Sequence, residues 1–253
     1  RAVILAGQTD AVEATNVENS GTLNDLHGII NVAGVDVAKN NYLELNDDLN
    51  AAVRALVLED RRLSVVHAAD TAQINYTEID FLNIFTGTGD DQIDVVSTNA
   101  KTDTFVLSDS GDDTFNLGAS TSLLNATDNY VAYDTDSTLN HIEGFLRLDA
   151  NAGYKLQSID DYKAVDLSTA EVGNTWSQLG YDTINLDNSG VQTTDGRISN
   201  TQIDGFGIAR NDDGNVAPTQ GVNAGILRYF DFDAMNLNLG NQADTVHVVG
   251  LFE

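Results

Sequence analysis

Apolar and polar side chains alternate with a period of two along most of this 253-residue chain. Such alternation predicts β-strands with one buried face, and the Gly, Asp and Asn residues between the alternating stretches predict turns. The clearest examples are Leu43/Leu45, Leu63/Val65, Phe105/Leu107, Phe115/Leu117, Ile184/Leu186, Leu237/Leu239 and Val246/Val248. Helical spacing is found at 47–56, where Asn46 can cap the segment and Leu49, Val53 and Leu56 share a face, and a shorter candidate is 158–163. The pattern therefore predicts an all-β protein with one or two short helices.

Two distant segments, 74–95 and 227–248, can be aligned almost residue for residue. Each has an alternating strand, a turn rich in Gly, Asp and Asn, and a second alternating strand. Weaker copies of the turn and second strand occur at 109–118, which lies 22 residues after the copy around Asp91, and at 180–186. Internal repeats of this kind predict a stacked architecture, because one repeat cannot bury its apolar side chains alone.

The spacing predicts a parallel β-solenoid with coils of about 22 residues. Roughly 11 coils at about 4.8 Å each would form a rod about 50 Å long. An antiparallel β-sandwich is the alternative, since alternation does not define strand direction. We expect one elongated domain over 1–253, less regular in 1–72 and more clearly repetitive in 73–253. Both ends fall within strand-like runs, so we interpret the chain as a segment of a longer polypeptide.

Composition narrows the function classes. Hydrophobic residues make up 42% of the chain, which is enough for a core, and no apolar run has the roughly 18 residues of a membrane span. The formal net charge of −27 argues against binding to nucleic acid or to an anionic membrane surface. Asp outnumbers Glu by 31 to 8, and Asp and Asn favour turns and oxygen-rich cation sites. The acidity could also be a solvated surface. The chain has no cysteine, which excludes disulfides and thiolate metal sites.

The segment 86–94 carries the most specific motif. Its sequence, TGTGDDQID, fits the calcium-binding nonapeptide G-G-x-G-x-D-x-U-x at every defined position except the first. The chain thus resembles the secreted RTX (repeats-in-toxin) proteins, in particular the β-solenoid regions of large bacterial adhesins and surface-layer proteins. The resemblance implies Ca²⁺ held between neighbouring turns by glycine carbonyls and Asp carboxylates. The metal-binding candidates that it implies are Gly87, Gly89, Asp91, Asp109, Gly111, Asp113, Asp182 and Asp244.

Two features leave the calcium interpretation open. In the family the nonapeptides follow one another directly, whereas here the copies lie at least 22 residues apart, so a second coil must complete each site. The G-x-G-D-D sequence can also be a simple corner turn, with Gly at positive φ and Asp capping the backbone.

The resemblance implies a non-enzymatic structural or adhesive module of a secreted or cell-surface bacterial protein, stabilised by calcium. The expected partners are further copies of the module, through the ends of the solenoid, and a cell-surface glycan or protein. The alternative function is a polysaccharide-active enzyme of the lyase type, because β-helices also carry that chemistry. The sequence contains no common catalytic motif, and its four histidines are scattered, so we expect no enzymatic activity.

Overall fold

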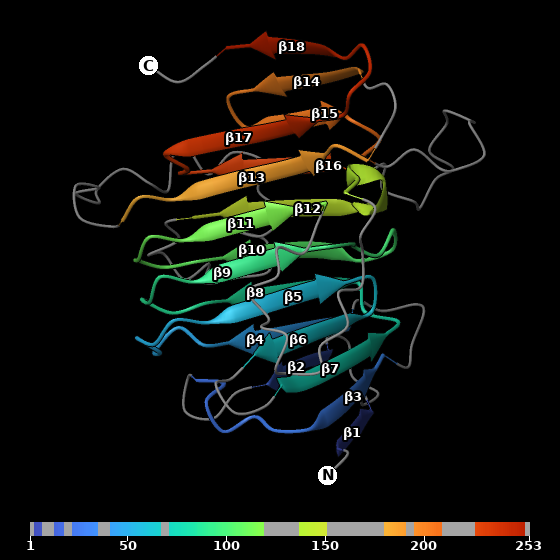
Figure 1. Cartoon of the computed structure of the whole chain (residues 1–253). Helices are drawn as coiled ribbons and strands as arrows, with labels where there is room; N and C mark the ends of the chain where they lie inside the picture. Colours follow the sequence, from blue (N-terminus) through green and yellow to red (C-terminus); the bar gives the residue numbers. More distant parts are fainter. Residues whose placement is uncertain are drawn as a thin grey trace.

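The computed structural model describes residues 3–6, 13–17, 22–34, 41–66, 71–118, 137–150, 180–190, 195–208 and 226–250. These residues form an all-β structure in which the chain builds two nine-stranded mixed sheets (Figure 1). The first sheet has the order β1-β3-β7-β6-β5-β9-β11-β13-β17, and the second has the order β18-β14-β15-β16-β12-β10-β8-β4-β2. We call them sheet A and sheet B. The helix candidate at 158–163 lies outside the described residues.

The strands are short and follow the predicted alternation. Sheet A contains β1 (Val3–Ala6), β3 (Ile29–Ala33), β5 (Ala55–Glu59), β6 (Arg62–Val66), β7 (Thr71–Thr77), β9 (Gln92–Val95), β11 (Thr114–Leu117), β13 (Thr183–Asn188) and β17 (Ala234–Leu239). Sheet B contains β2 (Glu13–Val17), β4 (Asn41–Asn46), β8 (Phe81–Phe85), β10 (Asp103–Leu107), β12 (Phe145–Asp149), β14 (Asp195–Ser199), β15 (Gln202–Gly205), β16 (Ile226–Phe230) and β18 (Thr245–Val249). One short 3₁₀ helix, η1 (Leu139–His141), precedes β12.

Most neighbouring strands in both sheets are parallel. The antiparallel pairs among the described residues belong to two inserted hairpins. In sheet A, β5, β6 and β7 alternate in direction, and in sheet B the same is true of β14, β15 and β16. Each insertion adds two antiparallel steps to one sheet. Because the direction reverses twice, the strands on the two sides of the insertion run parallel to each other. The two 22-residue segments that resemble each other each span both sheets, but their corresponding strands lie in opposite sheets. In 74–95 the strands β7, β8 and β9 belong to sheets A, B and A, whereas in 227–248 the strands β16, β17 and β18 belong to sheets B, A and B.

The core consists of the alternating apolar side chains of both sheets. Along sheet A, Ile93, Phe115 and Ile184 come from consecutive strands in one register and are fully buried. Leu82 and Leu146 contribute from sheet B in the same way. Burial of these apolar side chains on folding is the main contribution to the stability of the sheets, because short strands are not stable in isolation.

The predicted helix at 47–56 is wrong. Residues 47–54 form a turn and an irregular segment, and β5 begins at Ala55. Leu49 and Val53, which the helix was expected to place beside Leu56, are 72% and 66% exposed, whereas Leu56 is buried in the core. Asn46 does cap the segment, but it caps a turn, with its Oδ1 accepting from the Asp48 backbone N–H at 3.1 Å.

No described helix is long and apolar enough to cross a membrane.

Candidate functional site

A column of aspartates lies at the starts of neighbouring strands in sheet A. Asp91, Asp113, Asp182 and Asp233 each directly precede a strand, namely β9, β11, β13 and β17. These four strands pair in one parallel register, in which Gln92, Thr114, Thr183 and Ala234 are aligned. The aspartates therefore stack one above another although 22, 69 and 51 residues separate them in sequence. We call these four residues the aspartate column.

Each carboxylate of the column accepts a hydrogen bond from the backbone one strand earlier. Asp113 Oδ1 accepts from the N–H of Asp91 at 2.7 Å, and Asp182 Oδ1 accepts from the N–H of Asp113 at 2.8 Å. Asp233 Oδ2 accepts from the N–H of Asp182 at 2.9 Å, and Asp91 Oδ1 accepts from the N–H of Arg54 at 2.7 Å. A buried N–H without an acceptor costs free energy, so these bonds join consecutive strands at their entry points.

Asp47 extends the same arrangement toward the N-terminal strands. Its Oδ1 accepts from the N–H of Leu23 at 2.7 Å, and its Oδ2 forms a buried ion pair with Arg54 Nε at 2.8 Å. Asp47 and Arg54 are 1% and 6% exposed. The buried cation compensates the buried carboxylate, so this end of the column has a charge partner of its own.

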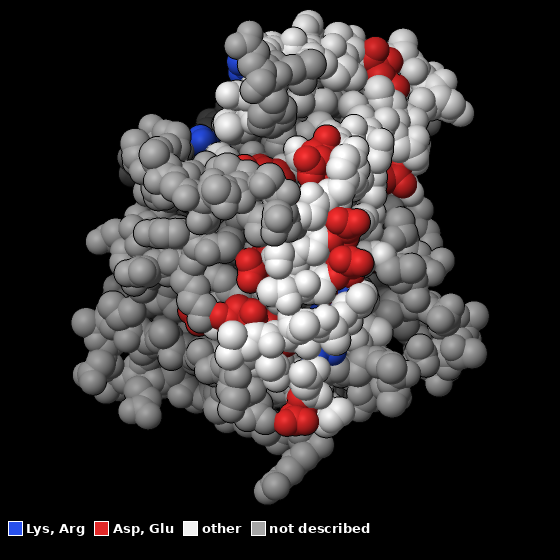
Figure 2. Space-filling view, turned by 90° about the vertical axis from the view of Figure 1, so that its left-hand side faces the viewer, with Lys and Arg blue, Asp and Glu red and all other residues white. Residues whose placement is uncertain are grey.

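A second set of aspartates makes similar bonds in the opposite direction. Asp90 Oδ1 accepts from the N–H of Asp112 at 3.0 Å, and Asp112 Oδ1 accepts from the N–H of Tyr181 at 2.8 Å. The sequence thus contains two Asp-Asp pairs, Asp90-Asp91 and Asp112-Asp113. In each pair the carboxylate of the first residue accepts from the backbone at the start of the next strand in sheet A, and that of the second accepts from the backbone at the start of the previous one. These outer aspartates are exposed, and Figure 2, which faces these turns, shows acidic side chains at intervals along the length of the molecule.

Glycines let the stacked turns approach closely. A Cβ on Gly111, at φ +137°, would lie 2.4 Å from the carbonyl oxygen of Gly89. A Cβ on Gly180, at φ +118°, would lie 1.6 Å from the carbonyl oxygen of Gly111. Any side chain at these positions would collide with the neighbouring turn. The recurring G-x-D sequence thus has a structural explanation in these contacts, with Gly giving the close approach and Asp satisfying the neighbouring N–H.

Burial makes the central carboxylates difficult to ionise. Burial raises the pKa of Asp91 to about 6, although the hydrogen bond from the Arg54 backbone opposes the rise. It raises the pKa of Asp113 to about 7, with further contributions from the negative charges of Asp91 and Asp182. Both residues are 2% exposed or less. The second oxygen, Oδ2, of Asp91 and of Asp113 is buried and has no hydrogen bond of standard geometry within the described part of the chain. The Thr86 hydroxyl near Asp91 and the Ser108 hydroxyl near Asp113 only partly offset the rise in pKa.

Within the column, the Oδ2 atoms of Asp91 and Asp113 are the atoms best suited to bind a cation. A buried carboxylate oxygen without a donor is stabilised by a proton or by a metal ion. Within the described residues, however, no three His, Cys, Asp or Glu side chains converge in a way that could hold a metal. Ca²⁺ accepts carbonyl and hydroxyl oxygens as well as carboxylates. A calcium ion here would therefore use Asp91 and Asp113 together with oxygens of the adjacent turns.

The structure brings some of the sequence-predicted residues together and separates others. Asp91, Asp113 and Asp182 belong to the column, and Gly89 and Gly111 stack beside it. Gly87 packs on the turn before β5, since a Cβ there would lie 1.8 Å from the Asn50 carbonyl oxygen. Asp109 is half-buried in the β10–β11 turn, and burial together with the nearby Asp48 charge raises its pKa.

Asp244 lies away from the column. It follows β17 and precedes β18, so it occupies a turn that leads from sheet A to sheet B, whereas the column lies on turns that lead into sheet A. Asp233 holds the equivalent place at the entry to β17. Neither Asp233 nor Asp47 was among the residues predicted from the nonapeptide motif. A signal for Asp233 exists: the strand entries DQIDV, DTFNL, DTINL and DAMNL at 91, 113, 182 and 233 share one pattern.

Searches of protein-family models, curated proteins and solved structures find no match to this chain.

Proposed function

We propose that this chain is a β-solenoid segment that serves as a structural or adhesive module of a secreted or cell-surface bacterial protein. The observation that carries the proposal is the aspartate column, in which a carboxylate, buried in Asp91, Asp113 and Asp182, bonds each strand entry to the neighbouring one. Side chains that link the entries of five strands of sheet A, from β5 to β17, suit a scaffold whose length and stiffness are its function. A single buried catalytic pair would not require such repetition.

The course of the chain supports the solenoid. Apart from the two inserted hairpins, the chain crosses to the other sheet after each strand. From β7 to β13 each new strand pairs in parallel with the strand placed before it in the same sheet, except that β9 pairs with the hairpin strand β5. Repeats of this kind stabilise their neighbours through shared interfaces. Outward-facing amides add to these interfaces, because Asn185 Nδ2 donates to Asn116 Oδ1 and Asn236 Nδ2 donates to Asn185 Oδ1, both at 2.8 Å.

Calcium is part of the proposal. The buried Oδ2 atoms of Asp91 and Asp113 support it, since a bound cation would supply the partner that these atoms lack. Calcium would also reduce the repulsion between stacked carboxylates in a chain of net charge −27. Ions that bind only the folded state stabilise it by mass action.

The test is thermal unfolding with Ca²⁺ and with a chelator at pH 7.5. At a free Ca²⁺ concentration of 100 Kd, linkage gives about 2.7 kcal/mol, which corresponds to an increase in Tm of about 5–10 °C for a chain of this size. The Asp91→Asn/Asp113→Asn variant should lose most of this increase, and Asp244→Asn, outside the column, should retain it. An equal Tm with and without Ca²⁺ would contradict the calcium part of the proposal and leave the scaffold part standing.

Self-association through the strand edges completes the proposal. Among the described residues, β17 and β18 are the last strands of their sheets, and Val248 and Val249 are 53% and 47% exposed. An unpaired strand edge is a template for pairing with another chain. Light scattering over a concentration series tests this, and a mass equal to one chain at every concentration would contradict it.

A second candidate function is polysaccharide cleavage, which one observation favours. A hollow of about 540 Å³ contains Arg61, Lys101 and His141 beside Glu143, so cationic and carboxylate side chains share one surface. Enzymes of the lyase type need a basic group next to a carboxylate of the polymer. Incubation with uronate polymers, followed by ultraviolet absorbance of an unsaturated product, tests this candidate.

A further inference from the structure

The inserted hairpin β5–β6 opens a groove at one edge of the molecule. In sheet B, β8 and β10 are direct neighbours, whereas in sheet A the two hairpin strands separate β7 from β9. Two strands correspond to about 10 Å at the usual strand spacing. The turn after β7 and the turn after β9 are therefore further apart than in an uninterrupted stack, and the hairpin tip at Asp60 and Arg61 lies between them.

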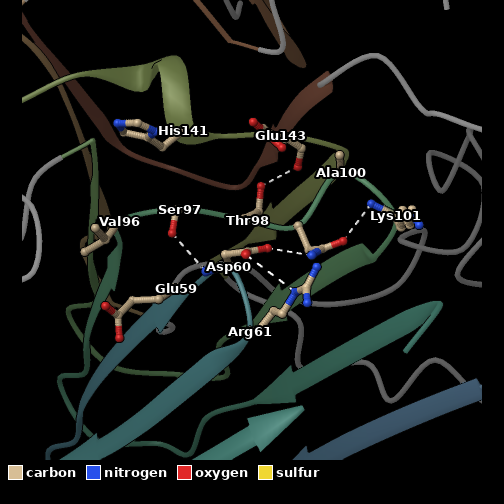
Figure 3. A pocket seen from close by; sticks show the side chains of 11 residues that line it. Glu59, Asp60, Arg61, Val96, Ser97, Thr98, Ala100, Lys101, His141 and Glu143 are labelled. Carbon is tan, nitrogen blue, oxygen red and sulfur yellow. Dashed lines mark hydrogen bonds and ion pairs between the residues drawn. The ribbon is translucent and has the colours of Figure 1, made fainter. Parts of the chain in front are cut away.

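The groove consists of adjoining hollows that share Arg61. The largest, of about 540 Å³, lies between the hairpin tip, the 96–101 turn and the segment 141–143, and Figure 3 shows its lining. A second lies between the hairpin tip, the 76–80 turn and residues 99–102, and a third lies along the hairpin. A volume of 540 Å³ is within the range of small-molecule sites.

Hydrogen bonds define the shape of the groove. The N–H of Asp60 donates to Ser97 Oγ at 2.8 Å, and Asn99 Nδ2 donates to Asp60 Oδ1 at 2.5 Å, so the hairpin tip is tied to the 96–101 turn. The same turn is also bonded to the segment 141–143, because the N–H of Thr98 donates to the His141 carbonyl oxygen at 3.0 Å. The walls are therefore held by contacts within the chain, which makes the groove largely preformed.

The groove contains three cationic side chains, Arg61, Arg62 and Lys101, among five carboxylates, which are those of Glu59, Asp60, Glu78, Asp80 and Glu143. The chain has 12 Lys and Arg residues against 39 Asp and Glu residues. Arg62 already forms two bonds to Glu59, at 2.5 and 2.7 Å. Lys101 is exposed, and its ammonium has no acidic partner in the part of the chain that the structure describes. Arg61 is 61% exposed and contacts Asp60 loosely at 3.6 Å, which leaves most of its donors for a ligand.

The remaining lining indicates a hydroxyl-rich ligand. Ser97, Thr98 and Asn99 provide short polar side chains, and His141 and Glu143 are exposed on the opposite wall. The apolar contributions to the largest hollow are Val96, which is only 3% exposed, and Ala100. Protein partners usually need large aromatic or apolar anchors, which the described lining does not present.

We propose that this groove binds a short stretch of an acidic polysaccharide, with Arg61 and Lys101 pairing with its carboxylates. The sugar hydroxyls bond to Asn99, Ser97 and Glu143 along the groove. This inference deepens the adhesive part of the proposed function by naming the ligand class and its site. It does not depend on calcium, because the groove lies at the turns that leave sheet A, whereas the aspartate column lies at the turns that enter it.

Isothermal titration with oligogalacturonates in EDTA at low salt tests the site. The wild-type chain should bind the oligouronate more tightly than a neutral oligosaccharide of equal length, and added salt should weaken the binding. The Arg61→Gln/Lys101→Gln variant should bind about ten- to hundredfold more weakly, as expected for the loss of charge-assisted hydrogen bonds. Arg197→Gln is the matched control, since Arg197 is 55% exposed on β14 and outside the groove. Circular dichroism confirms that each variant is folded.

Each result has a distinct meaning. Unchanged oligouronate binding by the double variant, or no binding by the folded wild-type chain, would overturn the groove assignment, whatever the calcium titration gives. Equal weakening by Arg197→Gln would also overturn it, since the effect would then be one of net charge. Ultraviolet-absorbing product would support the ligand class and overturn the non-enzymatic function.

Discussion

The aspartate column makes a sharp prediction at Asp113. Its Oδ1 is the acceptor for the buried N–H of Asp91, so Asp113→Ala leaves that N–H without a partner. The cost of an unsatisfied buried donor is about 1–3 kcal/mol. For a chain of this length each kcal/mol lowers Tm by about 2–4 °C. We therefore expect Asp113→Ala to lower Tm by roughly 2–12 °C in EDTA.

Asp113→Asn is the matched variant, because the amide oxygen can still accept from Asp91 and the buried charge is removed. At pH 8 we expect its Tm to equal or exceed that of the wild type. Burial raises the pKa of Asp113 to about 7 from its ordinary value near 3.8. The stabilising contribution of the protonated acid is fully present below about pH 4 and is lost as the pH rises through about 7.

The difference in Tm between wild type and Asp113→Asn should therefore change with pH in the range 4–8. As the pH rises, the Tm of the wild type should fall relative to that of the variant. Thermal unfolding followed by circular dichroism at pH 4.5 and pH 8 measures this difference, and the subtraction removes the effect of the other carboxylates. Asp113→Ala and Asp113→Asn of equal stability would refute the role of Oδ1 as a structural acceptor. A difference independent of pH would refute the buried, protonated state of Asp113.

Two further predictions concern packing. Gly111→Ala places a Cβ 2.4 Å from the Gly89 carbonyl oxygen and should lower the free energy of unfolding by more than Gly250→Ala, which shares a positive φ but has nothing within 4 Å. Urea unfolding of both variants measures the difference, and equal values would show that the turns can separate without cost. Phe115→Ala removes a fully buried ring and should cost about 3–5 kcal/mol. Leu49→Ala, at a 72% exposed position, should change stability by less than about 0.5 kcal/mol, and similar losses for the two would contradict the assigned core.

Tertiary contacts explain why 47–56 does not form the predicted helix. Leu49, Val53 and Leu56 have helical spacing, but Leu56 is needed in the register of β5, where it pairs with Ile93. Asp47 and Arg54 form a buried ion pair across the same segment. Local propensity is a weak preference that such tertiary contacts override. No pattern in the segment itself specifies those contacts.

The sequence by itself determined the β character of the chain, the positions of most described strands and the turns that carry Asp91 and Asp113. It could do so because alternation, glycine and aspartate act over a few residues. Only the tertiary structure decided which aspartates align. Asp233 joins the column and Asp244 does not, because strand register brings together residues 51 or 69 positions apart. The groove beside Arg61 and Lys101 likewise exists only because a hairpin separates two strands in one sheet and not in the other.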